Sequence, residues 1–247
     1  MSRTKIEWTE RRWNPVTGCT KVSQGCKNCY AEAMARRFWG GRKFTEIQCH
    51  TERLVEPFRW RRPSMVFVDS MGDLFHENVP NAFILQVFEI MKQCPQHTFQ
   101  ILTKRPERVL RWFNTEWFFE DVLPNLWIGV SVEDQKAAEE RIPLLLQTSA
   151  TVRFVSCEPL LDELHLENYF TRVFNGGGKF RGVDWVIAGC ESGAKRRLAE
   201  VDWFRSLRDQ CQKADIPFFM KQMEVDGKVR KLPLLESRRW MEFPKTQ

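Results

Sequence analysis

Short apolar runs recur along the chain, and each one ends abruptly in polar or charged residues. Their length and their β-branched or aromatic composition are typical of buried strands. Six such runs are Met65–Val68, Thr98–Leu102, Leu126–Val130, Val152–Val155, Asp184–Ala188 and Pro217–Met220, and the segment Trp13–Gly18 is a seventh candidate. The runs therefore predict a sheet of six or seven strands.

Between these runs, apolar residues recur at helical spacing. Pro106 suits the first turn of one helix, whereas Pro143 leaves the limits of another open. The apolar stripes lie within Phe83–Met91, Val109–Phe113, Ile142–Leu146 and Phe204–Cys211. Because strands that alternate with helices form a mostly parallel sheet, we expect an α/β fold, specifically a partial (β/α) barrel. A doubly wound open sheet is the alternative.

The length of 247 residues suits a single α/β domain that spans 1–247. Residues 168–182 are expected to form an inserted loop. Their glycine run, Gly176-Gly177-Gly178, predicts a flexible turn rather than a phosphate-binding loop, because no Lys-Ser/Thr follows it. No apolar run reaches the length of a membrane span, and no apolar stretch follows the first residues. The protein is therefore expected in the cytoplasm, where its eight cysteines would stay reduced.

Polar side chains follow the predicted strands at the point where each strand ends. In parallel α/β folds, sites are built at the carboxyl ends of strands. Helix caps account for many of the acids and serines, but a lysine near a helix N-terminus opposes the helix dipole. We therefore predict a site lined by both signs of charge, suited to a small zwitterionic ligand. Its candidate residues are Asp69, Ser70, Asp73, Lys104, Ser131, Glu133, Glu158, Glu191 and Lys221.

The strongest local signal is a cluster of three cysteines, Cys19, Cys26 and Cys29, spaced C-x6-C-x2-C. A C-x2-C pair lets two thiolates converge on one metal centre. Gly18 and Gly25 provide flexible points that let Cys19 fold back onto the same centre. Residues 31–36 have a helical composition, so the loop ends at a helix N-terminus, whose dipole favours anionic thiolates.

Three interpretations of the cysteine cluster remain open. An iron–sulfur cluster held by three thiolates keeps one iron open for a ligand or substrate. A structural zinc ion needs a fourth ligand, for which Cys49 and His50 are candidates. Buried structural cysteines are the third interpretation, although such residues seldom cluster in this way. We favour the iron–sulfur cluster.

The cysteine segments Trp13–Cys19 and Gly25–Glu32 resemble a phage- and prophage-associated three-cysteine-motif family of unassigned function, which in turn resembles divergent radical S-adenosylmethionine enzymes. The first gap is longer than in the C-x3-C-x2-C motif of those enzymes. The resemblance implies a [4Fe–4S] cluster on the three cysteines, with S-adenosylmethionine on the open iron. It continues through Leu102–Pro106, Gly129–Asp134, Ser156–Leu161, Asp184–Ile187 and Phe218–Gln222.

A basic cluster, Arg59, Trp60, Arg61 and Arg62, interleaves one aromatic ring with three cations. Arginine and tryptophan together can contact phosphates and stack on bases. The alternative is a solvated face with Trp60 packed into the core. Further basic groups are Arg36-Arg37 with Arg42-Lys43, Lys195-Arg196-Arg197 and Arg238-Arg239, in a chain of net charge +6.

These features predict an iron–sulfur protein that acts as a radical S-adenosylmethionine enzyme on a nucleic acid or nucleotide. The alternative is a zinc-stabilised phage protein that binds nucleic acid without catalysis. The two differ in colour, because an anaerobically purified iron–sulfur protein is brown and a zinc protein is colourless.

Overall fold

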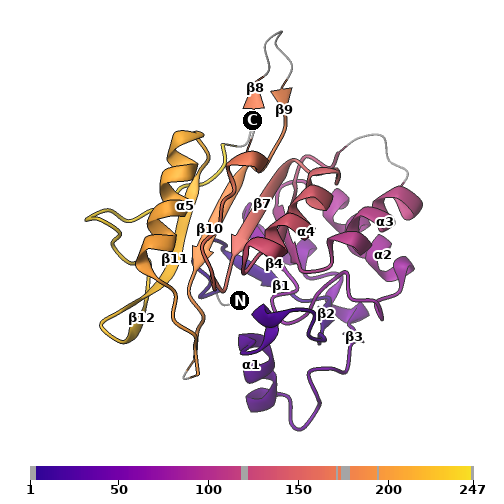
Figure 1. The fold of residues 1–247 in the computed structure, drawn as a ribbon. Helices are drawn as coiled ribbons and strands as arrows, with labels where there is room; N and C mark the ends of the chain where they lie inside the picture. Colours follow the sequence, from indigo (N-terminus) through magenta and orange to yellow (C-terminus); the bar gives the residue numbers. More distant parts are fainter. Residues whose placement is uncertain (1–3, 118–121, 171, 174–178, 194, 246–247) are drawn as a thin grey trace.

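The computed structural model describes residues 4–117, 122–170, 172–173, 179–193 and 195–245. Within these residues an eight-stranded sheet has the order β1-β4-β5-β6-β7-β10-β11-β12 (Figure 1). Neighbouring strands are parallel from β1 to β11, and β12 is antiparallel to β11. The strands are β1 (Arg11–Trp13), β4 (Met65–Val68), β5 (Thr98–Thr103), β6 (Leu126–Ser131), β7 (Val152–Cys157), β10 (Trp185–Gly189), β11 (Phe218–Val225) and β12 (Lys228–Lys231).

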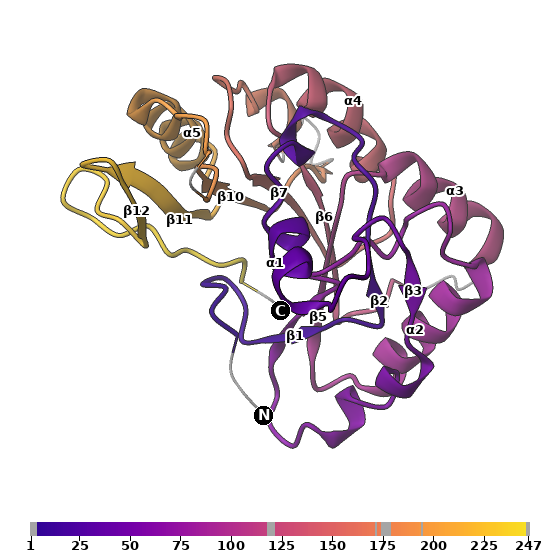
Figure 2. The same ribbon diagram turned by 90° about the horizontal axis from the view of Figure 1, so that it is seen from below.

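The sheet curls into a half-barrel, which confirms the predicted partial barrel rather than the doubly wound alternative. Four helices flank its outer side in the described part of the chain: α2 (Asn81–Gln93), α3 (Pro106–Glu116), α4 (Gln135–Leu146) and α5 (Val201–Lys213). Figure 2, which views the molecule from below, shows α1 (Tyr30–Phe38) over the opening of the curled sheet. The half-barrel therefore has a helical outer layer and one end covered by α1.

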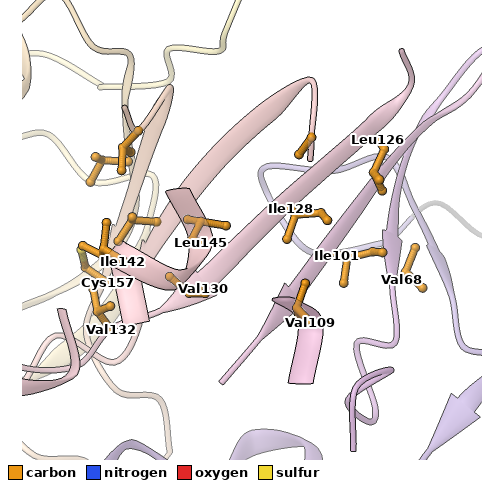
Figure 3. Packing of buried hydrophobic residues seen from close by; sticks show 14 of the residues in the cluster. Val68, Ile101, Val109, Leu126, Ile128, Val130, Val132, Ile142, Leu145 and Cys157 are labelled. Atoms are coloured by element: carbon orange, nitrogen blue, oxygen red, sulfur yellow. The ribbon is translucent and has the colours of Figure 1, made fainter. Parts of the chain in front are cut away.

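The outer face of the sheet packs against these helices. Val68, Ile101 and Ile128 lie in register on three adjacent strands and are at most 1% exposed. Figure 3 shows such strand residues beside Val109 of α3 and Ile142 of α4. Because both faces of parallel strands are covered, each strand is a continuous apolar run, and this is why the runs were visible in the sequence.

The inner face of the half-barrel is filled by large aromatic side chains. Trp8 enters from the segment before β1 and lies 4.7 Å from Phe67 and 6.3 Å from Trp185, measured between ring centroids. Gly129 on β6 makes room for Phe154, because a Cβ at Gly129 would lie 2.5 Å from that ring. The cluster consists of Trp8, Phe67, Trp127, Val152, Phe154, Trp185, Ile187 and Phe219. It forms a solid floor in the half-barrel.

Several predicted elements have different limits in the structure. The segment Trp13–Gly18 is not one strand: β1 joins the main sheet, and β2 (Val16–Thr17) pairs instead with β3 (Gln48–Cys49). Pro143 lies inside α4. The predicted inserted loop at 168–182 contains a short antiparallel pair, β8 (Arg172–Val173) with β9 (Lys179–Phe180), whereas Gly176-Gly177-Gly178 lie outside the described residues. Among the described residues, no helix is long and apolar enough to cross a membrane.

Candidate functional site

A cavity of about 780 Å³ lies at the carboxyl ends of the parallel strands. Its volume is within the range of small-molecule and cofactor sites. The residues that line it include the three clustered cysteines and eight of the nine polar residues predicted at strand ends: Cys19, Cys26, Cys29, Asp69, Ser70, Asp73, Lys104, Ser131, Glu158, Glu191 and Lys221. Two independent features of the sequence therefore meet at one place, and Glu133 is the exception.

Gly18 determines how Cys19 enters the cavity. Its φ angle is +97°, and a Cβ there would lie 2.5 Å from the carbonyl oxygen of Glu46. The backbone N–H of Cys19 donates to the carbonyl of Phe44 at 2.9 Å, and that of Gly18 donates to Met71 at the same distance. A glycine is therefore required at this position, both for its conformation and for the close approach of the neighbouring backbone.

The other two cysteines lie at the turn that precedes α1. Cys26 ends a short 3-10 helix (Gln24–Cys26), and its Sγ lies 3.9 Å from the hydroxyl of Ser23. Cys29 immediately precedes α1, and its carbonyl accepts a hydrogen bond from the N–H of Ala33 at 3.1 Å. The expected helix after the cysteines is thus confirmed. The N-terminal end of its dipole lies at Cys29 and favours negative charge there.

Arg105 is the polar partner of Cys19. Its Nη1 lies 3.6 Å from Cys19 Sγ and 3.4 Å from Asp73, while its Nη2 donates to the hydroxyl of Thr20 at 2.8 Å. Burial and the nearby Asp73 carboxylate raise the pKa of the Cys19 thiol to about 12, against the opposing effect of the Arg105 charge. The metal-free thiol is therefore protonated at neutral pH, and a bound metal would have to displace that proton.

The two candidate fourth ligands of the zinc alternative, Cys49 and His50, lie apart from the cavity that the three cysteines line. Among the described residues, no three His, Cys, Asp or Glu side chains converge closely enough to hold one metal ion. Zinc requires its sulfur ligands to converge at about 2.3 Å, and an iron–sulfur cluster likewise requires its three thiolates to converge, each on a separate iron. His50 hydrogen-bonds through Nε2 to Thr17 at 2.8 Å and through Nδ1 to Glu52 at 3.1 Å. Neither His50 nor Cys49 lines the cavity.

The remaining cysteines divide between the cavity and the core. Cys190 lines the cavity and is 3% exposed, and its burial raises the pKa of the thiol to about 11. Cys94, Cys157 and Cys211 are buried in the outer core among apolar residues. Cys190 is therefore a further thiol that lines the cavity, and Cys94, Cys157 and Cys211 are packing residues.

Glu191 lines the cavity and also holds the cysteine loop. Its carboxylate accepts a hydrogen bond from Asn28 Nδ2 at 2.8 Å and from the backbone N–H of Arg197 at 2.9 Å. The Arg197 guanidinium also donates to the carbonyl of Gln24 at 3.0 Å. Although burial favours the protonated form, these hydrogen bonds keep the pKa of Glu191 below its ordinary value. Glu191 therefore ties both ends of the segment that carries Cys26 to the end of β10.

Glu133 does not line the cavity. Its carboxylate pairs with Arg141 of α4 at 2.9 Å, and Arg141 also donates to the carbonyl of Ser131 at 2.7 Å. A Cβ at Gly25 would lie 2.9 Å from the Glu133 carboxyl carbon, so the cysteine loop rests directly on this pair. The strand-end pattern placed Glu133 among the ligand-binding candidates; the structure places it in the framework beneath the loop.

At the strand ends of the cavity, three buried oxygen atoms have no hydrogen-bond partner among the described residues: Asp69 Oδ2, Ser156 Oγ and Glu158 Oε1. Burial raises the pKa of Asp69 well above its ordinary value, although its Oδ1 accepts a hydrogen bond from Val16 at 2.8 Å. The other Glu158 oxygen pairs with Lys221. Unpaired buried polar atoms are costly and mark functional sites. These three oxygens suit a ligand that carries N–H or O–H groups.

Ser70 and Asp73 also line the cavity, but each is held by neighbours. The Asp73 carboxylate accepts hydrogen bonds from the Thr103 hydroxyl at 2.8 and 2.9 Å. The Ser70 hydroxyl donates to Asn14 at 3.1 Å, and its carbonyl accepts from the Tyr30 hydroxyl at 2.6 Å. Both residues therefore shape the wall. Lys104 and Ser131 complete the predicted residues that line it.

Comparison with known families places the chain in one of them. The family described as protein of unknown function (DUF5131) matches residues 3–244. The chain belongs to the DUF5131 family. Searches of the curated proteins and of the solved structures give no match. The family match therefore covers the whole half-barrel and its cavity. The function of the protein has to be inferred from the residues of this site.

The basic cluster of this DUF5131 protein lies away from the cavity. Trp60 is 5% exposed, with its ring edge-on to His97 at 5.5 Å and the Arg11 guanidinium 5.2 Å above it. The segment precedes β4, so it lies at the opposite ends of the strands from the cavity. Arg59, Arg61 and Arg62 are exposed. The alternative prediction, that Trp60 packs into the core, is confirmed, and stacking of this ring on a base is ruled out by its burial.

Sequence reasoning left several cavity residues of the DUF5131 protein out of the candidate set, among them Arg105, Ser156 and Tyr30. Arg105 was not among the candidates, although it follows Lys104 at the same strand end. Ser156 is the second-last residue of β7 (Val152–Cys157) and lies two residues before Glu158, so it points to the same side of the sheet. Tyr30 follows Cys29 directly, and its hydroxyl reaches the cavity wall. The alternation of a strand would have identified Ser156, whereas the other two require tertiary contacts.

Proposed function

We propose that this protein is a radical S-adenosylmethionine-type enzyme with a [4Fe–4S] cluster on Cys19, Cys26 and Cys29, and that its substrate is a nucleic acid or nucleotide. The observation that carries the proposal is the meeting of the three cysteines with a mixed-charge rim in one cavity at the strand ends. The resemblance of the cysteine segments to the phage- and prophage-associated three-cysteine-motif family supports the same function.

The residues around the cysteines suit an anionic cluster. The Arg105 guanidinium is 9% exposed and contacts Cys19, so its charge acts through a poorly solvated environment. The α1 N-terminus adds a favourable dipole beside Cys29. Cationic and N–H groups near cluster sulfurs also influence the reduction potential. Arg105 would therefore both stabilise the bound cluster and tune its reduction.

The rest of the cavity suits S-adenosylmethionine, which carries an amino group, a carboxylate and hydroxyl groups. The unpaired oxygens of Asp69, Ser156 and Glu158 can accept hydrogen bonds from its amino, hydroxyl or adenine N–H groups. Lys104 and Lys221 can approach its carboxylate. When bound, the cluster and S-adenosylmethionine would supply a carbon radical that abstracts a hydrogen atom from the substrate.

The test is the metal content and ligand binding of anaerobically purified protein. We expect about four iron atoms per chain, a brown colour, and loss of iron in Cys19→Ala, Cys26→Ala and Cys29→Ala. Calorimetry should detect S-adenosylmethionine binding that disappears when the cluster is removed. Full retention of iron by Cys26→Ala would contradict the assignment, as would equal binding of S-adenosylmethionine by cluster-free protein.

Cys49→Ala is the matched control. Cys49 is half-buried and lies near the cysteine loop, but it does not line the cavity. The cluster proposal therefore expects normal iron content in this variant. The zinc alternative, with Cys49 as fourth ligand, expects a colourless protein whose zinc is lost on this substitution. The metal content of this one variant therefore separates the iron–sulfur enzyme from the zinc-stabilised binding protein.

A further inference from the structure

Helix α1 presents large side chains to the solvent. Tyr30, Met34 and Phe38 are 46, 41 and 61% exposed, and they follow one another at intervals of four residues, about 6 Å along the helix. The buried residues of this helix are the small Ala31 and Ala35. An amphipathic helix normally directs its large apolar residues to the core. Here the large residues form an exposed stripe, which is typical of an interaction site.

Positive charge is concentrated around this stripe. Residues 21–46 contain six cations and two carboxylates, so they carry four of the six net positive charges of the chain. The Arg37 guanidinium lies 5.1 Å from the ring centroid of Phe38, and that of Arg42 lies 3.8 Å from the ring of Trp39. We name the exposed residues Tyr30, Met34, Arg37, Phe38 and Lys43 the α1 surface.

The chemistry of the α1 surface matches a single-stranded nucleic acid. Exposed rings stack on bases of any sequence, and cations beside them neutralise the phosphates. A duplex hides its bases and offers no ring to stack upon. The positive charge of residues 21–46 favours an anionic partner, and the exposed ring of Phe38 favours a partner that carries aromatic bases.

The α1 surface leads into the cavity. Tyr30 lines the cavity and donates its hydroxyl to the carbonyl of Ser70 at 2.6 Å, while its ring remains half exposed. Lys21, Val22 and Phe44 line the same mouth. Figure 2 shows α1 over the opening of the half-barrel. A strand bound along the helix would therefore pass one nucleotide from Tyr30 to the cavity.

We propose that the α1 surface binds single-stranded nucleic acid and delivers one base to the cavity. The delivery step rests on the proposed catalytic function of the cavity, whereas the binding step does not. The α1 surface thereby replaces the cluster Arg59–Arg62 as the nucleic-acid contact. That cluster lacks an available tryptophan ring and lies at the far ends of the strands.

The experiment is fluorescence anisotropy of labelled oligonucleotides, single-stranded DNA and RNA and a duplex of equal length, across a salt series. We expect Phe38→Ala to weaken single-strand binding by roughly 5- to 150-fold, the effect of one lost base stack. Arg37→Ala combined with Lys43→Ala should flatten the slope of log affinity against log salt by about 1.4, because two phosphate contacts are lost.

The matched controls lie at the other basic cluster. Phe58 is 47% exposed and adjoins Arg59, so Phe58→Ala removes a comparable ring from a comparable basic segment. We expect Phe58→Ala to leave single-strand binding unchanged, and melting curves should be unaffected in both phenylalanine variants. Equal losses in Phe38→Ala and Phe58→Ala, or stronger binding of the duplex, would overturn the proposal.

Iron content and S-adenosylmethionine binding are measured in the same preparations. Protein that holds iron and S-adenosylmethionine but binds no oligonucleotide at low salt overturns the α1 proposal and leaves the cavity function intact. Protein without iron whose oligonucleotide binding depends on Phe38 supports the α1 surface and contradicts the cavity function. Two further measurements complete the test: binding of the protein to phosphatidylserine vesicles, and its self-association, followed by sedimentation at rising protein concentration. Phe38-dependent vesicle binding or self-association, without oligonucleotide binding, would overturn the proposal.

Discussion

Replacing Glu133 by alanine tests whether this carboxylate belongs to the ligand site or to the framework. The Glu133 side chain is 1% exposed and that of Arg141 is 8% exposed, and their N–O distances are 2.9 and 3.4 Å. Removal of one partner leaves the other charge buried without compensation, which costs about 3–5 kcal/mol. Since each kcal/mol shifts the melting temperature of a chain of this size by about 2–4 °C, we expect Glu133→Ala to melt about 6–20 °C below the wild type.

The matched control removes both charges. Apolar residues of similar volume often replace a buried ion pair without loss of stability. Glu133→Leu combined with Arg141→Met should therefore recover most of the lost melting temperature. The assay is thermal denaturation followed by circular dichroism, together with the iron content of each variant. Because Gly25 rests against Glu133, the single variant should also bind iron less completely.

Two results would refute this reasoning. A normal melting temperature for Glu133→Ala with weakened S-adenosylmethionine binding would mean that the carboxylate reaches the ligand. Failure of the double variant to recover stability would mean that mutual neutralisation is not the main role of the pair. In that case the hydrogen bond from Arg141 to the Ser131 carbonyl would be the dominant contribution.

Three further predictions concern substitutions of Asp69, Gly129 and Trp60. Burial raises the pKa of Asp69, so the native state binds that proton more tightly than the unfolded state, whose pKa is about 3.9. The stabilising contribution of protonated Asp69 is therefore present at low pH and is lost as the pH rises toward the folded pKa. Asp69→Asn should melt above the wild type at pH 8, and the difference in melting temperature should be smaller at pH 4. Gly129→Ala should cost about 1–3 kcal/mol, measured by chemical denaturation, because its methyl group would meet the Phe154 ring at 2.5 Å. Trp60→Ala should cost about 3–5 kcal/mol and leave oligonucleotide anisotropy unchanged, and a changed affinity at unchanged stability would contradict the core position of this ring.

The sequence predicted the sheet well because parallel strands covered on both faces are continuous apolar runs. It missed β12, whose residues are mostly exposed and charged. A signal was nevertheless present. Asp226-Gly227 joins β11 to β12 as a two-residue turn, with φ angles of 51 and 71°. Asp-Gly between two extended segments is a strong hairpin signal, and it would have added the antiparallel edge strand.

The candidate site was predictable in its location but not in its roles. Strand ends identified the cavity, because the fold brings all of them to one rim. They could not distinguish a carboxylate that faces the cavity from one that pairs with a helix. For Glu133 the missing information is Arg141, a charged residue on the buried stripe of α4 beside Ala138 and Ile142. A buried arginine requires an anionic partner, and only the tertiary structure identifies that partner as Glu133.

The N- and C-terminal segments beside the two open edges of the half-barrel explain why the cavity lies above a solid floor. A sheet that does not close leaves its inner face accessible between β1 and the β11–β12 edge. Trp8 covers this face from the N-terminal segment, and Phe243 covers it from the C-terminal segment, 5.3 Å from both Trp185 and Phe219. Lys231 of β12 pairs with Glu7 at 2.5 Å and joins the two edges. These aromatic rings fill the lower half of the inner face, so the cavity lies above them, at the strand ends beside the cysteines.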